Sequence, residues 1–265
     1  MKDISVVLPI ASSKHKNFME LFTNAIVSIK NQSSQPKELV LVHSNEESLV
    51  SILNEFDFSG LTVNMVENKG QTDFASQMNL GVEKSTSEWV SFLEFDDEYA
   101  SIWFKNVQTY IEAHPNVNGF LSLVVDVDDK GTFAGFTNEA SFAASMNTEI
   151  GFLTNEVLLD YQNFQSAGMV IKKETYQESG GFKPSLKLTF VYEFLLRLTY
   201  NSVKLMTIPR IGYKHLNMRE GSIFWNYKNG TNRVTEDEVR FWLDTAKKEH
   251  FFIEDRNIKY EPVSV

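Results

Sequence analysis

Four carboxylates follow directly on an apolar segment in the first half of the chain. Residues 89–93 are typical of a buried strand, and Glu94, Asp96, Asp97 and Glu98 come immediately after it. In an open α/β sheet, ligands bind beyond the carboxyl ends of the strands. Carboxylate oxygens are preferred ligands of hard divalent cations, and such a cation can neutralise a diphosphate. The segment therefore predicts a site for a cation and a phosphate-bearing ligand.

The spacing of the acidic residues suggests a division of roles. In an extended chain Glu94 and Asp96 point to the same side, about 7 Å apart. One carboxylate could then hold a metal ion while the other binds a ribose hydroxyl. The alternative is a solvated acidic loop after a strand, and the position at a strand end favours the binding site.

Two other polar segments have competing interpretations. Asp126-Val-Asp-Asp129 repeats the acidic spacing, but Lys130-Gly131 after it favours a hairpin turn. Residues 69–73 form a polar turn before a helix, where free N–H groups and Asp73 could contact a nucleotide. Helix N-capping by Thr72 or Asp73 explains that turn equally well.

Composition excludes several classes of protein. The 265 residues carry a formal net charge of −10, which disfavours binding to nucleic acid or to anionic membranes. The absence of cysteine excludes disulfides, thiolate zinc sites and cysteine nucleophiles. No apolar run approaches the roughly 18 residues that span a bilayer, and the run near the N-terminus is too short for a signal peptide. We expect a soluble cytoplasmic protein without a transmembrane segment.

The elements that position the acidic segment alternate along the first hundred residues. Apolar runs predict strands and apolar stripes at helical spacing predict helices between them. The strands are expected at 4–8, 39–42, 61–66 and 89–93, and the helices at 18–29, 49–56 and 75–82. This order predicts an α/β fold with a Rossmann-like, mostly parallel sheet that has helices on both faces.

The second half has a more mixed pattern. Strands are expected at 120–127, 132–136, 168–171 and 203–208, and helices at 102–111 and 191–198. Residues 137–162 show no period, and a loop of that length is usually functional. Thr235 and Glu238 form a capping box at the start of a last helix. We predict one domain over 1–222 and a C-terminal helical extension packed on it over 223–265.

Several motifs occur in the order and spacing of a known family. They are Ile4-Ser-Val-Val-Leu-Pro9, Asn79-Leu-Gly81, Phe92-Leu-Glu-Phe-Asp-Asp97, Ser166-Ala-Gly-Met-Val-Ile171 with Gly180-Gly-Phe182, and Tyr213-Lys-His215 with Gly221-Ser222. Over residues 4–223 the chain resembles the family 2 glycosyltransferases, which have the GT-A fold. The resemblance implies a nucleotide-sugar half over 1–98 and an acceptor half over 99–222.

The resemblance also implies an activity and its residues. The expected reaction is a metal-dependent, inverting transfer of a sugar from a nucleotide-diphosphate sugar to a carbohydrate or other hydroxyl acceptor. Asp96, Asp97 and His215 would hold Mn²⁺ or Mg²⁺. The residues expected to contact the nucleotide sugar are Pro9, Ala11, His43, Asp73, Glu94, Phe95 and Arg219. His215 has an ordinary alternative, that of a packed or surface histidine.

Departures from the family pattern leave two questions open. His43-Ser-Asn-Glu46 replaces the usual Asp-Asp-Gly-Ser and Met78 replaces an Arg, so the base of the nucleotide is not identified. Residues 190–191 are Phe-Val where the family has Glu-Asp, whose Asp removes the acceptor proton. Glu193, two residues further on, is the candidate catalytic base; the alternative is that it only pairs with Arg197 at i,i+4.

Two other functions remain in view. The missing Glu-Asp pair is also expected in a non-catalytic relative that binds a sugar or a nucleotide. A nucleotidyltransferase is disfavoured, because residues 11–15 are not the Gly-rich loop that such enzymes place after the first strand. The donor sugar, the acceptor and the oligomeric state do not follow from the sequence.

Overall fold

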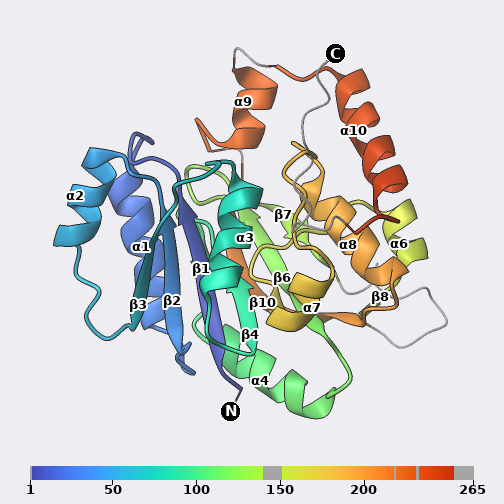
Figure 1. The fold of residues 1–265 in the computed structure, drawn as a ribbon, viewed down its shortest axis with the longest axis horizontal. Coiled ribbons are helices and arrows are strands. Elements are labelled where there is room, and N and C mark those ends of the chain that lie inside the picture. Colours follow the sequence, from blue (N-terminus) through green and yellow to red (C-terminus); the bar gives the residue numbers. More distant parts are fainter. Residues whose placement is uncertain (1, 140–150, 218, 231–232, 254–265) are drawn as a thin grey trace.

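One mixed sheet with helices on both faces forms the centre of the protein (Figure 1). The structure is a computed structural model, and it describes residues 2–139, 151–217, 219–230 and 233–253. The sheet order is β3-β2-β1-β4-β9-β6-β10-β5, with β7 beside β6 and β8 beside β10. The α/β fold class predicted from the alternation of strands and helices is confirmed.

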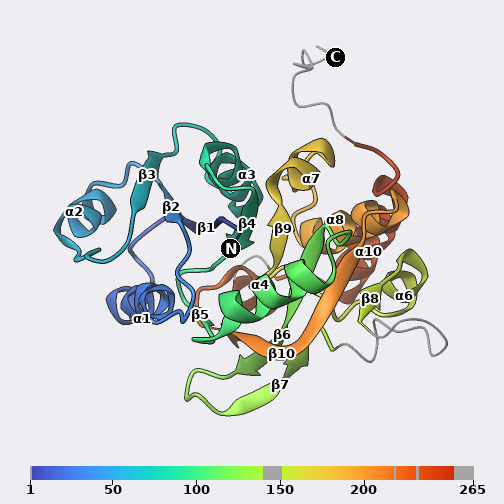
Figure 2. The same cartoon turned by 90° about the horizontal axis from the view of Figure 1, so that it is seen from below.

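The first four strands form the parallel part of the sheet. They are β1 (Ile4–Ile10), β2 (Glu38–His43), β3 (Val63–Glu67) and β4 (Trp89–Phe92). The helices between them are α1 (Phe18–Lys30), α2 (Glu47–Glu55) and α3 (Phe74–Lys84). In Figure 2 the sheet lies between α1 and α3. All seven elements were predicted, and their ends differ from the predicted ends by one or two residues in most cases.

Alternation along β1 explains how both faces are covered. Val6 and Leu8 belong to the hydrophobic cluster that contains α1, whereas Val7 belongs to the cluster that contains α3. Gly81 lets α3 approach β1 closely, because a Cβ at Gly81 would lie 2.3 Å from Val7 Cγ1. The helices α1 and α3 therefore bury the two faces of the sheet at β1.

The second half completes the sheet with strands in both directions. β9 (Val170–Lys172) is antiparallel to β4 and to β6 (Gly119–Val127), and β10 (Leu205–Leu216) is parallel to β6. The short strand β5 (Glu98–Tyr99) pairs antiparallel with β10. This pairing brings the end of the acidic segment beside residues 213 and 214.

Two expectations about this half need correction. The strand expected at 203–208 continues to Leu216, with register shifts against β6 between Ile208 and Tyr213. The segment 137–162, expected to lack regular structure, contains β8 (Phe152–Leu153) and α6 (Asn155–Asp160). Residues 140–150 of that segment lie outside the described part of the chain.

The hairpin expected after β6 is present. β7 (Phe133–Thr137) pairs antiparallel with β6, and the Asp128 carboxylate accepts hydrogen bonds from the backbone N–H groups of Lys130 and Thr132. Gly131 has φ 76°, which glycine adopts without strain. The Asp126–Asp129 segment therefore forms a strand end and a turn.

The remaining helices cover the second half. They are α4 (Trp103–Ala113), α7 (Lys173–Glu178), α8 (Phe190–Tyr200), α9 (Ile223–Asn229) and α10 (Glu236–Glu249). The capping box of Thr235 and Glu238 is confirmed. Ala246 of α10 belongs to the same hydrophobic cluster as α8, and the partly buried Leu243 packs against that cluster. Figure 1 shows α9 and α10 on the side of the sheet where β1 ends. In the described ranges, none of the helices combines the length and the apolarity that crossing a membrane requires.

Candidate active site

The acidic segment forms a turn between β4 and β5, and neighbouring strands hold its backbone. Leu93 N–H donates to the Val7 carbonyl at 3.0 Å, and Glu94 N–H donates to the Tyr213 hydroxyl at 3.0 Å. Asp97 N–H then closes the turn on the Glu94 carbonyl. Residues from β1, β4 and β10 therefore fix this acidic turn, which we define as residues 94–97.

Asp97 is bound to the end of β10. Its two carboxylate oxygens lie 3.0 and 3.2 Å from His215 Nδ1, and one also accepts the Leu216 N–H at 2.8 Å. The side chain of Asp97 has no exposed surface. The structure thus brings together two of the residues expected to be metal ligands.

Asp96 is bound to the segment that follows β10. Arg219 Nε lies 2.5 Å from Asp96 Oδ2, and the two side chains are only 9% and 8% exposed. The Arg219 guanidinium also lies over the Phe95 ring, at 5.0 Å from its centre. His15, from the loop after β1, stacks on Phe95 with ring centres 5.0 Å apart. Two distant parts of the chain therefore meet on the acidic turn.

Burial and crowding shift the protonation of this cluster. Burial, with the charges of Asp97 and Asp96, raises the pKa of Glu94 to about 8. Burial and Asp97 also raise the pKa of Asp96, although Arg219 opposes the shift. For His215, burial lowers the pKa, but the charge and hydrogen bond of Asp97 outweigh it, with help from Glu94 and Asp126, and the pKa rises to about 10. At neutral pH the imidazole is charged and Glu94 is largely protonated.

Asp126 is a member of this cluster that sequence reasoning did not assign to the site. It lies opposite His215 in the pairing of β6 with β10, and its carboxylate accepts a hydrogen bond from Thr137 Oγ1 at 2.6 Å. An aspartate inside the strand predicted at 120–127 was the available signal. The hairpin turn after it gave a sufficient local explanation, and the neighbouring strand is far away in the sequence.

The chemistry of the cluster suits a hard divalent cation, but the arrangement does not form a ready site. Carboxylates and an imidazole are suitable ligands for Mn²⁺. Asp96, however, is paired with Arg219 and Asp97 with His215. Within the described ranges, no three or more His, Asp or Glu side chains are positioned to hold a metal ion. A cation at Asp96 would require Arg219 to leave.

The other residues expected to contact the nucleotide lie at strand ends nearby. Pro9 is buried in β1, Ala11 is exposed directly after that strand, and His43 is half-buried at the end of β2. His43 Nδ1 lies 2.9 Å from the Ser44 carbonyl. Asp73 caps α3 by accepting the Ser76 N–H, so the capping interpretation of that turn is the observed one.

Glu46 joins the loop after β1 to the loop after β2, and sequence reasoning did not single it out. Its carboxylate accepts hydrogen bonds from the hydroxyls of Ser12, Ser13 and Ser48 at 2.6 to 2.7 Å. These bonds lower the pKa of Glu46 to about 2. Glu46 thereby fixes the shape of the loop that also carries His15.

Glu193 does not have the surroundings of a catalytic base. Its side chain has no exposed surface and binds Arg197 at 2.8 Å and Lys183 at 3.1 Å. A base must reach the proton it removes, and a carboxylate enclosed by two cations cannot reach an acceptor in this conformation. The i,i+4 pairing with Arg197 is the observed role, so the assignment of Glu193 as base needs correction.

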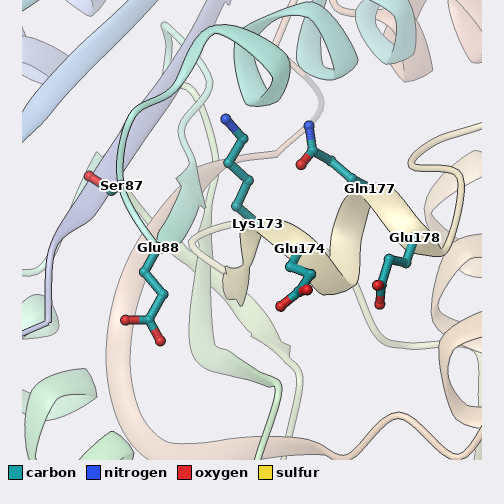
Figure 3. A pocket seen from close by; sticks show the side chains of 6 residues that line it. All are labelled: Ser87, Glu88, Lys173, Glu174, Gln177 and Glu178. Atoms are coloured by element: carbon teal, nitrogen blue, oxygen red, sulfur yellow. The ribbon is translucent and has the colours of Figure 1, made fainter.

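Two surface hollows lie away from the acidic turn. One, of about 450 Å³, is lined by residues 67–71 with Ser76 and Leu80. The other, of about 320 Å³, is lined by Ser87, Glu88, Lys173, Glu174, Gln177 and Glu178 (Figure 3). In Figure 3 the Lys173 amine points toward α3, where it donates to the carbonyls of Glu83 and Ser85. Neither hollow contains Asp96 or Asp97, whose side chains are closed off in this structure.

Comparison with known proteins connects this geometry to a family. The profile of glycosyl transferase family 2 matches residues 15–168, more than half of the chain. An uncharacterized glycosyltransferase of Haemophilus influenzae (strain Rd) is 25% identical over 174 residues, which cover 64% of this chain and 55% of that protein. The chain thus spans little more than half the length of that relative.

Solved structures share the fold. TarS 1–349 of S. aureus superposes with a TM-score of 0.61 and 17% identity, covering 94% of this chain and 72% of that one. The same TarS fragment in complex with UDP-GlcNAc gives a TM-score of 0.63, also at 17% identity, and covers 92% of this chain and 66% of that one. The matched profile, which includes the whole acidic turn, shows that this chain belongs to glycosyl transferase family 2.

Proposed function

We propose that this protein is a glycosyltransferase that moves a sugar from a nucleotide-diphosphate sugar to an acceptor hydroxyl. The observation that carries the proposal is the acidic turn at the carboxyl end of β4, joined to the cation of Arg219. Membership of the family supports the class of reaction. The UDP-GlcNAc complex of TarS supports a uridine diphosphate sugar as the donor to test first.

The residues of the turn have complementary roles in this proposal. Arg219 is a permanent cation beside the turn and would bind the diphosphate, whose charge increases as the sugar departs. The oxygens of the Glu94 carboxyl group can accept hydrogen bonds, which suits a ribose hydroxyl as the donor. Phe95 keeps the Arg219 guanidinium and the His15 ring in place by direct contact.

We also propose Mn²⁺ or Mg²⁺ as the cofactor. Asp96, with Asp97 and His215, would hold the ion, and His215 would give up its proton to do so. When bound, the ion supplies a Lewis acid that neutralises the leaving diphosphate. Inversion at the anomeric carbon by direct displacement is the stereochemical outcome that we propose for the transfer.

A non-catalytic nucleotide-sugar-binding protein is the second candidate. The observation that favours it is the loss of the base, because Val191 stands at the family position and Glu193 is enclosed by Lys183 and Arg197. Such a protein would bind the donor without turning it over.

Release of UDP separates the two candidates. The protein is incubated with UDP-GlcNAc and with other UDP-sugars, in Mn²⁺ and in EDTA, and free UDP is measured over hours. An enzyme is expected to release UDP slowly by hydrolysis even without an acceptor, and EDTA should stop the release. Donor binding without any release, from every UDP-sugar, would favour the binding protein. Equal release in EDTA would contradict the proposed cofactor alone.

A further inference from the structure

The carboxylate expected to bind a cation is already occupied by a side chain of the same protein. Asp96 Oδ2 lies 2.5 Å from Arg219 Nε, and both side chains are more than nine-tenths buried. A divalent ion on the same carboxylate would stand beside a permanent positive charge in a poorly solvated place, and the two cations would repel each other. Arg219 and a metal ion therefore compete for Asp96.

The contacts of Arg219 leave part of its guanidinium able to bind another ligand. Besides Asp96, it lies over Phe95 and donates from Nη1 to the Glu220 carbonyl at 3.2 Å. Among the described residues, Nη2 has no hydrogen-bond partner. A guanidinium has five N–H donors in a fork that matches phosphate oxygens, so Arg219 can bind a diphosphate while its stem stays in place.

Asp96 cannot be reached without such a change. Its side chain is 8% exposed, and Arg219, which covers it, is 9% exposed. The diphosphate of a nucleotide sugar is a stronger attraction for the guanidinium than one carboxylate, since it carries two negative charges. Transfer of Arg219 from Asp96 to the diphosphate would both bind the donor and release Asp96.

We infer that Arg219 is a latch on Asp96, a side chain that blocks the cation site until the nucleotide draws it away, so that nucleotide and divalent cation bind cooperatively. The inference rests on the proposed function, because it takes the nucleoside diphosphate as the ligand. It adds an order of events: the protein without nucleotide binds divalent cations weakly, and the nucleotide strengthens that binding. By linkage, the cation strengthens nucleotide binding by the same factor.

Binding of Mn²⁺ alone tests the latch without any turnover. Free Mn²⁺ is followed by electron paramagnetic resonance during titration of the wild type, Arg219→Gln and the control Arg210→Gln. Arg210 is exposed and lies in β10, so its substitution removes the same charge away from Asp96. Arg219→Gln is expected to bind Mn²⁺ at least about tenfold more tightly than the wild type and Arg210→Gln. The double variant Asp96→Asn/Arg219→Gln should lose that gain, because the ion binds at Asp96.

The wild type provides an independent test if Arg219→Gln does not fold. Mn²⁺ is titrated with and without saturating UDP, and a titration of UDP alone corrects for ion held by the nucleotide. UDP is expected to tighten Mn²⁺ binding by at least about tenfold. Equal Mn²⁺ affinity with and without UDP would overturn the latch, as would folded Arg219→Gln that binds Mn²⁺ no better than the wild type. Neither result depends on UDP release, so a failure of the latch is distinguishable from a failure of the proposed function.

Discussion

The three carboxylates of the acidic turn are balanced in three different ways. Asp96 pairs with Arg219, Asp97 pairs with His215, and burial keeps Glu94 largely protonated at neutral pH. A cluster of like charges is stable in a buried place only when each charge has a partner or is removed by a proton. The donor diphosphate and its cation must therefore replace contacts that the protein makes with itself.

Glu46 predicts a dependence of stability on pH. Its folded pKa of about 2 is below the unfolded value, so its ionised form stabilises the fold above the unfolded pKa, and this contribution disappears as the pH falls from about 4.5 to about 2. The group is partly exposed, which limits the effect. Glu46→Gln is expected to lower the free energy of unfolding by about 1 kcal/mol at pH 7. The measurement is urea unfolding at pH 7 and at pH 3.

The wild type and Glu46→Gln should differ less at pH 3 than at pH 7. Glu112→Gln, an exposed glutamate on α4, is the control and should change little at either pH. A difference between wild type and Glu46→Gln that grows at low pH would contradict the hydrogen-bonding role of the carboxylate.

At the scale of single residues, the sequence identified the acidic groups, and the family resemblance placed His215 and Arg219 at the same site, but neither predicted which side chains pair. Glu94, Asp96 and Asp97 stand together after one strand, and their position is a local signal. Arg219 lies 123 positions from Asp96, and Lys183 lies ten from Glu193, so no pattern in the sequence indicates these contacts. The partners follow from the sheet order and the turns, which only the fold shows.

At the scale of elements, the close approach of α3 to β1 depends on glycine at position 81, which has no side chain. A Cβ at Gly81 would lie 2.3 Å from Val7 Cγ1, closer than two carbon atoms can pack. Gly81→Ala is therefore expected to displace α3 and to lower the free energy of unfolding by about 2 kcal/mol, despite the better helix propensity of alanine. Thermal unfolding measures the effect. Gly135→Ala, at a position with no atom within 4 Å of the added Cβ, is the control and should change little.

The ion-pair network of Glu193 gives a second prediction at this scale. Glu193→Gln would leave Lys183 and Arg197 buried without an anion, and a lost partner in a buried pair typically costs about 3–5 kcal/mol. A large fall in the melting temperature is expected, with Glu178→Gln on the exposed side of α7 as the control. An unchanged melting temperature together with abolished UDP release would return Glu193 to the role of catalytic base.

Some helices and strands could be predicted from the sequence, and others could not. The first four strands are continuous buried runs with helical stripes between them, which is a strong local signal. β5 has two residues and exists only through its pairing with β10, and β10 continues past Pro209 because β6 supports it. Such elements have no signal of their own, and they are the ones that bring His215 to the acidic turn.

At the scale of the whole molecule, one sheet joins both halves around the proposed site. β9 lies between β4 and β6, so the acidic turn of the first half faces the β10 strand of the second. The division of residues 1–222 into halves at residue 98 stays a prediction, since the sheet is continuous across that boundary, and so does the separate extension over 223–265. The chain also spans only part of its relatives, so the acceptor and the physiological reaction stay proposals.

Calorimetric titration of UDP into the wild type and Asp96→Asn, in Mn²⁺, tests the central claim most directly. Asp129→Asn is the matched control, because it makes the same chemical change in the exposed hairpin turn. If the acidic turn holds the diphosphate through a cation, Asp96→Asn should bind UDP at least about tenfold more weakly than the wild type, about 1.4 kcal/mol, while Asp129→Asn binds like the wild type. Undiminished UDP binding by a folded Asp96→Asn variant would contradict the claim that a cation at Asp96 holds the diphosphate.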